Sequence, residues 1–191
     1  MIISGSQALA LCRIGFGLYF ISQAWDKTNK GWLNSGATLA GMLFGNPTAQ
    51  PPTRGAVAGA EPFYRSFLES VVQPNVLLFS QLVNIGEWAV GLLLLFGLLT
   101  RLGAIVGLWL NLNYMLMKGL LNNAGSNDRL FILADLAFIL GAAGLAWGLD
   151  GAWRRQLGGN PVTRWLAGRP EPEKAYERPG RVPVRETGRA T

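Results

Sequence analysis

Four long apolar stretches dominate this sequence and limit what the chain can fold into. They cover residues 6–25, 76–100, 102–117 and 130–149, and none of them carries more than one formal charge. About 20 consecutive apolar residues are enough to cross ~30 Å of hydrocarbon as an α-helix. Lipid offers no hydrogen-bond partners to a free backbone, so crossing segments must be helical. We therefore predict four membrane-spanning helices.

The connections between these stretches predict an antiparallel four-helix bundle. Only the short turn at 100–101 separates the second stretch from the third, so these two helices must lie side by side in opposite directions. The first connection, 26–75, is long and should carry short interfacial helices. We expect a transmembrane domain over residues 1–150 and a basic, proline-rich tail over 151–191.

Basic residues near the helix ends predict that both termini are cytoplasmic. The positive-inside rule compares the two sides of the membrane. The terminal side carries Arg101, Arg154, Arg155, Arg164 and Arg169. The opposite side also carries basic residues, namely Lys27, Lys30, Arg54, Arg65, Lys118 and Arg129, which leaves the inverted topology open. We expect a multi-pass protein of the cell inner membrane.

The long connection contains two kinds of sequence. Residues 45–60 are rich in Gly, Ala and Pro and are expected to form a linker. In residues 63–72, apolar side chains recur every four positions beside Arg65 and Glu69, which is typical of an amphipathic helix. This helix is expected either to lie at the lipid interface or to pack as a cap over the mouth of the bundle.

The tail is expected to lack regular structure on its own because prolines and charged residues dominate it. We expect other subunits of a membrane complex to contact it. Arg154 and Arg155 would meet anionic lipid headgroups, and a tail tethered to four spans is not expected to bind nucleic acid.

The counts of histidine and cysteine exclude several kinds of redox centre. The chain has no histidine and one cysteine, Cys12. It therefore lacks the usual ligands of a membrane haem and the pair of thiols that dithiol chemistry requires, and no haem or metal is expected on it. Electron transfer by this chain would need a bound quinone or a partner.

Charged residues inside the spans are the first candidates for function, because burying a charge in a membrane is costly. We predict that Arg13 and Glu87 form a buried pair and take part in catalysis. In this interpretation, Glu87 gains or loses a proton as a quinone reacts; in the alternative, the pair only fixes the register of the helices. Asp135 is expected to be satisfied locally by Lys27, Lys118 or Arg129.

Uncharged polar and aromatic residues add candidates for a quinone pocket. We select Asn84, Trp88 and Asn111 for this pocket, with Trp109 and Tyr114 as further apolar walls. The alternative for each amide is a hydrogen bond between helices, and for each aromatic ring a lipid or core contact. On the outer side, Lys27 and Arg129 are candidates for binding an anionic substrate, although a solvated rim would contain the same charges.

Three segments together resemble the DoxX/DoxD family of small four-helix membrane proteins. They are "LCRIGFGLYFISQAWDK" at 11–27, "IGEWAVGLLLLFGLLTRLGAIVG" at 85–107 and "LGAAGLAWGLD" at 140–150. The resemblance covers most of residues 8–150, apart from the 45–60 linker. The matching positions are Arg13, Lys27, Glu87 and Arg101.

This resemblance implies a function in quinone chemistry. The family includes the membrane subunit of a thiosulfate:quinone oxidoreductase, so the resemblance implies an anionic sulfur substrate near the outer surface, a quinone in the bundle and a partner subunit. A noncatalytic accessory subunit of a larger respiratory or photosynthetic complex is the alternative. A small transporter is a third hypothesis, but the sequence has no internal repeat to favour it.

Overall fold

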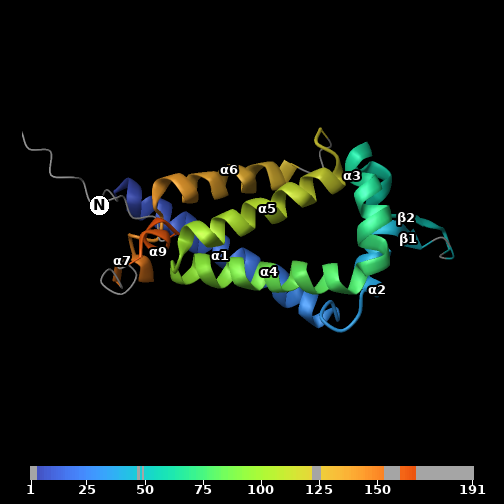
Figure 1. Ribbon diagram of the computed structural model, residues 1–191, viewed down its shortest axis with the longest axis horizontal. Helices are drawn as coiled ribbons and strands as arrows, with labels where there is room; N and C mark the ends of the chain where they lie inside the picture. Colours follow the sequence, from blue (N-terminus) through green and yellow to red (C-terminus); the bar gives the residue numbers. More distant parts are fainter. Residues whose placement is uncertain (1–3, 47, 49, 122–125, 153–159, 167–191) are drawn as a thin grey trace, which may run out of the picture.

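The computed structural model describes residues 4–46, 48, 50–121, 126–152 and 160–166. The described chain is mostly helical. Four long helices run along one another, and short elements collect at their two ends (Figure 1). We call the end that carries the β-strands the loop end and the opposite end, which carries Ser4 and Leu149, the terminal end.

The four long helices are α1 (Gly5–Asn29), α4 (Val76–Phe96), α5 (Thr100–Lys118) and α6 (Ser126–Gly141). Helix α1 packs against α4, α4 against α5, α5 against α6, and α6 against α1. A capping box at Ser4 starts α1, because the Ser4 hydroxyl accepts from the Gln7 N–H and the Gln7 side chain bonds back to Ser4.

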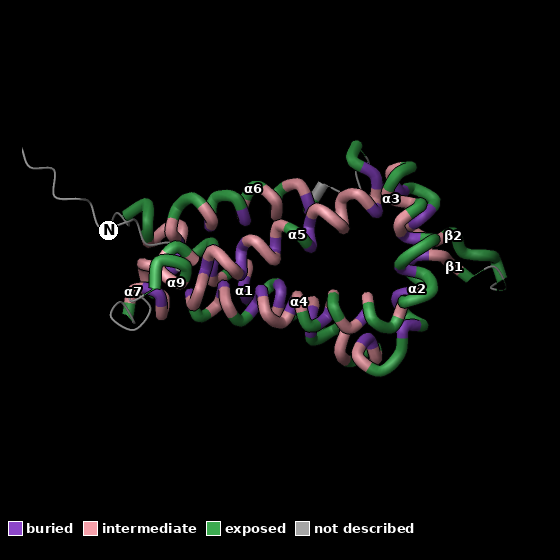
Figure 2. The backbone as a smooth tube through the Cα atoms, in the orientation of Figure 1, coloured by how far each residue is buried: buried purple, intermediate pink, exposed green. Residues whose placement is uncertain are grey.

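The four long helices expose many apolar side chains, while charged and amide side chains are among their buried residues. Their exposed side chains include Leu11, Leu18, Leu82, Ile85, Leu133 and Leu140. Their buried side chains include Arg13, Asn84, Glu87, Asn111 and Asp135. Exposed stretches lie along the outside of the long helices in Figure 2. Charged groups turned inward and leucines turned outward are expected of helices surrounded by lipid.

Within the described residues, two helical segments are long and apolar enough to cross a membrane, Gly5–Asn29 and the continuous stretch Pro62–Phe96. Helix α6 has 16 residues, which at ~1.5 Å per residue gives about 24 Å, less than the ~30 Å hydrocarbon core. The two long apolar segments and the exposed leucines of the helices support membrane localisation.

The helix ends differ from the predicted spans at the terminal end. The second span was expected to reach residue 100, but α4 ends at Phe96 because Gly97 adopts a left-handed conformation with φ of 64°. The fourth was expected over 130–149, whereas α6 ends at Gly141. The apolar composition continues through the turns that follow, so hydropathy alone did not mark either helix end.

The loop end is built from short elements. These are α2 (Ala37–Phe44), the antiparallel strands β1 (Gly45–Asn46) and β2 (Thr53–Arg54), the 3₁₀-helix η1 (Ala56–Gly59), α3 (Pro62–Phe67), the π-helix η2 (Leu68–Val72) and the 3₁₀-helix η3 (Gln73–Asn75). The expected 45–60 linker is therefore a small hairpin followed by η1. The amphipathic segment 63–72 forms α3 and η2, and it buries Leu68 and Val72 against the loop-end core as a cap.

Two hydrophobic cores hold the molecule together. The core at the loop end contains Trp32, Leu39, Leu43, Val57, Ala60, Leu68, Val72 and Met117. The core between the long helices contains Phe20, Val90, Leu94, Ala104, Leu110, Phe138 and Ala143.

Part of the predicted tail folds back onto this chain. After α7 (Leu149–Ala152), the helix α9 (Pro161–Leu166) contacts α5. Arg101 Nη1 donates to the Trp165 carbonyl at 3.1 Å, and its guanidinium stacks on the Trp165 ring. Residues 153–159 and 167–191, where we predicted contacts with other subunits and with lipid headgroups, lie outside the described residues.

Candidate functional site

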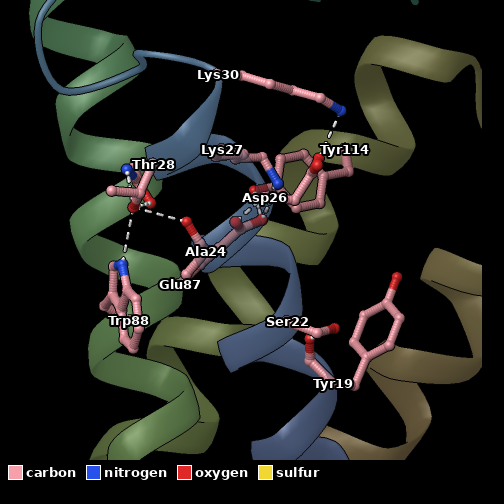
Figure 3. Close-up of polar contacts among 11 residues, drawn as sticks. Tyr19, Ser22, Ala24, Asp26, Lys27, Thr28, Lys30, Glu87, Trp88 and Tyr114 are labelled. Carbon is pink, nitrogen blue, oxygen red and sulfur yellow. Dashed lines mark hydrogen bonds and ion pairs between the residues drawn. The ribbon is translucent and has the colours of Figure 1, made fainter.

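A buried ion pair joins α1 to α4 in the half of the molecule nearer the loop end. Lys27 Nζ lies 2.8 Å from Glu87 Oε1 and 2.7 Å from Oε2. The Tyr114 hydroxyl, from α5, donates to Glu87 Oε1 at 2.7 Å. Figure 3 shows Lys27 and Tyr114 converging on Glu87. Three helices thus supply one carboxylate with a cation and a hydrogen-bond donor, which stabilise its charge in a buried site.

The predicted pair between Arg13 and Glu87 is wrong. Arg13 donates to backbone carbonyls at the terminal end, those of Leu94, Leu95, Ala143 and Trp147. The carbonyls at a helix C-terminus have no partner within the helix, so a guanidinium is well suited to satisfy them. Arg13 therefore has a structural role, because its hydrogen bonds link α1 to the end of α4 and to the turn after α6.

Asp150 makes a second set of hydrogen bonds to helix-end backbone at the terminal end, which supports this structural role for Arg13. Asp150 Oδ1 accepts from the Leu99 N–H at 2.7 Å, and Oδ2 accepts from the Thr100 N–H and hydroxyl at 3.0 and 2.7 Å. These donors lie at the start of α5, where backbone N–H groups need acceptors. Arg13 and Asp150 together fix the turns that join the helices at this end.

Two residues predicted for the quinone pocket, Asn84 and Trp88, share a hydrogen-bond partner on α1. Asn84 Nδ2 lies 3.0 Å from Thr28 Oγ1, and Trp88 Nε1 lies 3.1 Å from the same atom. Thr28 Oγ1 itself donates to the Ala24 carbonyl at 2.8 Å (Figure 3). Asn84 and Trp88 line neither of the cavities described below, so these polar atoms bridge helices instead.

A cavity of about 160 Å³ lies beside Glu87, and we call it the polar cavity because four charged residues help to line it. Its charged lining residues are Lys27, Glu87, Lys118 and Asp128. Lys118 Nζ lies 2.8 and 3.1 Å from the Asp128 oxygens, so each lysine is paired with a carboxylate. The four formal charges cancel, and neither ammonium is free to neutralise an anion by itself.

The predicted anion site of Lys27 and Arg129 does not form in this geometry. Lys27 is bound to Glu87, whereas Arg129 Nη1 donates to the Leu120 carbonyl at 2.6 Å and lines neither cavity. Lys118, rather than Arg129, shares the polar cavity with Lys27. This difference arises because Lys118 is on the same face of α5 as Tyr114, four residues away.

Asn111, the third residue predicted for the quinone pocket, lines the polar cavity and bonds to Asp135. Asn111 Nδ2 donates to Asp135 Oδ2 at 2.8 Å. Asp135 Oδ1 has no hydrogen-bond partner among the described residues. The prediction that Lys27, Lys118 or Arg129 satisfies Asp135 is therefore wrong, because each of them bonds elsewhere.

An apolar cavity of about 330 Å³ opens between α2, α3, η2, α4 and α5. Leucine, valine and aromatic side chains form most of its wall, among them Leu39, Phe67, Val72, Val83, Val106 and Leu110. Tyr64 donates to Asn113 Oδ1 at 2.7 Å within this wall. A predominantly apolar cavity of this size with a few polar groups is typical of a small-molecule site.

The two cavities share part of their lining. Trp32, Met42, Tyr114 and Met117 line both of them. Tyr114 therefore borders the apolar cavity while its hydroxyl bonds to Glu87. An apolar ligand bound there would lie next to a buried network of ionisable groups, and this is the arrangement that proton-coupled chemistry requires.

The sequence identified Glu87, Lys27, Asn111 and Tyr114 but missed the roles of Thr28, Trp32, Lys118 and Asp128. A signal was present in α5, where Asn111, Tyr114 and Lys118 are three and four residues apart and so share one face. Trp32 carries no such signal, because it lies in a turn and resembles any tryptophan at a lipid boundary.

Fold and site together define a helical membrane protein with a buried polar network beside an apolar cavity. A family model described as "TQO small subunit DoxD" matches residues 56–168, which is more than half of the chain. The chain belongs to the DoxD family, which confirms the resemblance found in the sequence. Glu87 and Tyr114 lie inside the matched region, whereas Arg13 and Lys27 precede it. No curated protein and no solved structure matches the chain.

Proposed function

We propose that this protein is the integral membrane subunit of a quinone-linked oxidoreductase complex of the thiosulfate:quinone type. The observation that carries the proposal is the apolar cavity that shares Tyr114 with the Glu87 network. Membership of the DoxD family supports the same function, since the family description names a small subunit of TQO. Because that description names a small subunit, it also supports the presence of a partner protein in the complex.

The apolar cavity fits a quinone better than it fits a hydrophilic substrate. Its wall offers aliphatic and aromatic contacts to a ring, and its lining continues into a cavity that contains charged groups. A bound quinone supplies a two-electron acceptor that takes up two protons when it is reduced. The chain itself would need to hold and deliver those protons, and its network is suited to do so.

Glu87 and Tyr114 are the residues that we assign to proton transfer. The Tyr114 hydroxyl donates to Glu87 Oε1, and the Tyr114 side chain lines the apolar cavity, so Tyr114 links the carboxylate to the wall that a ligand would contact. Lys27 keeps Glu87 in position through both carboxylate oxygens. The electrons would come from an anionic sulfur compound held with the help of the partner subunit, because the two cavity lysines are already paired.

We further propose that α1, α4, α5 and α6 all cross the cell inner membrane, with both termini in the cytoplasm. The outward-facing leucines of α6, Leu130, Leu133 and Leu140, support its contact with lipid. The basic residue Arg101 lies at the terminal end, which supports this orientation. The transmembrane domain would then comprise residues 1–150.

Mass spectrometry of the gently solubilised protein tests the function. Gly86 lines the apolar cavity, and a Cβ there would meet Leu110 side-chain atoms at ordinary contact distances of 3.4–4.0 Å. Gly86→Leu should therefore project a side chain into the cavity. We expect quinone to copurify with the wild-type protein and to be lost from this variant.

The matched control is Gly15→Leu, because Gly15 is exposed on α1 with nothing within 4 Å of a Cβ. It should retain quinone. A stable partner subunit that copurifies without quinone, in the wild type and in both variants, would instead assign the chain to the alternative function, a noncatalytic accessory subunit.

A further inference from the structure

We infer that the indole N–H of Trp32 donates a hydrogen bond to a carbonyl oxygen on the ring of the ligand that binds in the apolar cavity. This assignment rests on the proposed function and deepens it, because it names the atom that recognises the ligand. It also defines the ligand class as an apolar ring that bears a hydrogen-bond acceptor at its edge, which is the chemistry of a quinone.

Trp32 is buried where the two cavities meet, and its indole N–H is unsatisfied. The side chain is 3% exposed and lines both cavities. Its Nε1 atom has no hydrogen-bond partner among the described residues. A buried donor without a partner is unfavourable, so a ligand that supplies an acceptor to this N–H binds more tightly than one that does not.

The other polar groups in the wall of the apolar cavity already donate to protein atoms. The Tyr64 hydroxyl donates to Asn113, Asn113 Nδ2 donates to the Trp109 carbonyl at 2.6 Å, and the Tyr114 hydroxyl donates to Glu87. Trp109 itself is 66% exposed on the outer face of α5. Asn113 keeps a second N–H but is only half-buried, so among the described residues of this wall Trp32 is the buried side chain whose donor has no protein partner.

The backbone that carries the Trp32 side chain is fixed by hydrogen bonds from α4. Ser80 Oγ donates to the Trp32 carbonyl at 2.7 Å, and Gln81 Nε2 donates to the next carbonyl, that of Leu33, at 2.8 Å. The Lys27 ammonium lies 5.3 Å from the centre of the Trp32 ring. These contacts anchor the turn to α4, so little freedom is lost when a ligand binds.

The unpaired N–H of Trp32 favours a ligand that carries an oxygen over a plain hydrocarbon. The charges of Lys27, Glu87, Lys118 and Asp128 in the neighbouring cavity cancel in pairs, so the ligand is expected to be neutral. An acyl chain of a lipid could fill the apolar wall but would leave the N–H unpaired. A ring that carries a carbonyl makes apolar contacts with the wall and accepts a hydrogen bond from the Trp32 N–H.

Binding to Trp32→Phe in lipid nanodiscs tests the assignment. This substitution removes the N–H and keeps an aromatic ring in the wall. We expect the Kd of a short-chain benzoquinone to rise by about three- to tenfold, the effect of one net hydrogen bond. The affinity for an alkylbenzene of matched size, which has no acceptor, should stay within twofold of wild type.

Trp25→Phe is the matched control, since Trp25 is 60% exposed and lines neither cavity. It should bind both probes as the wild type does. Equal benzoquinone affinity in wild type and Trp32→Phe would overturn the assignment and leave the proposed function intact. An equal loss of affinity for both probes in Trp32→Phe would also overturn the assignment. Absence of benzoquinone binding to the wild type would refute the proposed function itself.

A second measurement needs no variant. The infrared carbonyl bands of benzoquinone bound to the wild-type protein should differ from each other, because one carbonyl accepts a hydrogen bond. That band should also move when the buried N–H exchanges with deuterated buffer. Two identical bands, insensitive to deuteration, would overturn the role of Trp32.

Discussion

Lys27 and Glu87 depend on each other, because each would be a buried unpaired charge without its partner. Glu87 is 2% exposed and Lys27 15% exposed. Removing one member of such a pair typically costs about 3–5 kcal/mol, whereas replacing both by neutral groups costs far less. The pair is therefore best tested by single and double substitution.

We predict that Lys27→Met strongly lowers the thermal stability of the protein in detergent, by the equivalent of about 3–5 kcal/mol. The double variant Lys27→Met with Glu87→Gln should recover most of the loss, because no buried charge is left uncompensated. Size-exclusion profiles after heating measure the thermal stability of the single and the double variant. A double variant that is less stable than the Lys27 variant would contradict this account of the pair.

Arg13 has a structural role at the opposite end of the helices, so its substitution should separate stability from binding. Arg13→Met leaves four carbonyls without their donor, and we expect a loss of several kcal/mol. Arg13→Lys should lose less, since it keeps the charge but cannot reach all four acceptors.

Quinone affinity, measured on the folded fraction of each Arg13 variant, should equal that of wild type, because Arg13 lines neither cavity. A tenfold weaker affinity in well-folded Arg13→Lys would restore Arg13 to the catalytic role first inferred from the sequence.

At the level of single residues, the sequence identified the charges but not their partners. A charge within an apolar span is visible in the sequence, and Arg13, Glu87 and Asp135 were found in this way. The partner depends on helix rotation and depth, which periodicity does not fix. Arg13 binds backbone carbonyls, and these carry no sequence signal at all.

Among the helices, the contact between α1 and α4 depends on two glycines that let the backbones approach closely. A Cβ on Gly17 would lie 2.5 Å from the Leu95 nitrogen and 2.9 Å from the Gly91 oxygen. A Cβ on Gly91 would lie 2.9 Å from the Ile21 nitrogen. Small residues at such crossings are typical of membrane helices.

We predict that Gly17→Ala destabilises the protein by about 1–3 kcal/mol, because backbone atoms must move apart to admit the methyl group. Gly15→Ala, two residues away and exposed, should be neutral or stabilising by up to about 1 kcal/mol. Melting temperatures of the two variants in the same detergent make the comparison. Equal effects would contradict the packing seen between α1 and α4.

Helix positions were easier to predict than helix ends. The long apolar stretches correspond to α1, α4, α5 and α6, and the amphipathic pattern at 63–72 corresponds to α3 and η2. The ends at Phe96 and Gly141 were missed because the turns beyond them are themselves apolar. The hairpin at β1 and β2 was missed because its Gly- and Pro-rich sequence resembles a linker.

At the scale of the whole molecule, the proposed four crossings predict which segments share a side of the membrane. Thr53 in the hairpin and Leu121 after α5 belong to the loop end, whereas Ser4 and Asn160 belong to the terminal end. Single cysteines at these positions, in a Cys12→Ser background, should react with a membrane-impermeant thiol reagent in two groups.

In right-side-out vesicles we expect Thr53→Cys and Leu121→Cys to react at once, and Ser4→Cys and Asn160→Cys only after the vesicles are opened. If Leu121→Cys and Ser4→Cys react on the same side, one of α1, α4 and α5 does not cross, which would contradict the four-span arrangement. The inverse pattern for all four would retain the four spans and reverse the orientation.

The central claim is that the apolar cavity between α2, α3, η2, α4 and α5 binds a quinone, and a photoreactive quinone analogue tests it most directly. After illumination in native membranes and peptide mapping, we predict labelling of cavity residues such as Leu39, Val72 and Leu110, suppressed by an excess of unlabelled quinone. Labelling confined to outward-facing residues outside the cavity, such as Leu11 or Leu133, and unaffected by competition, would contradict the claim.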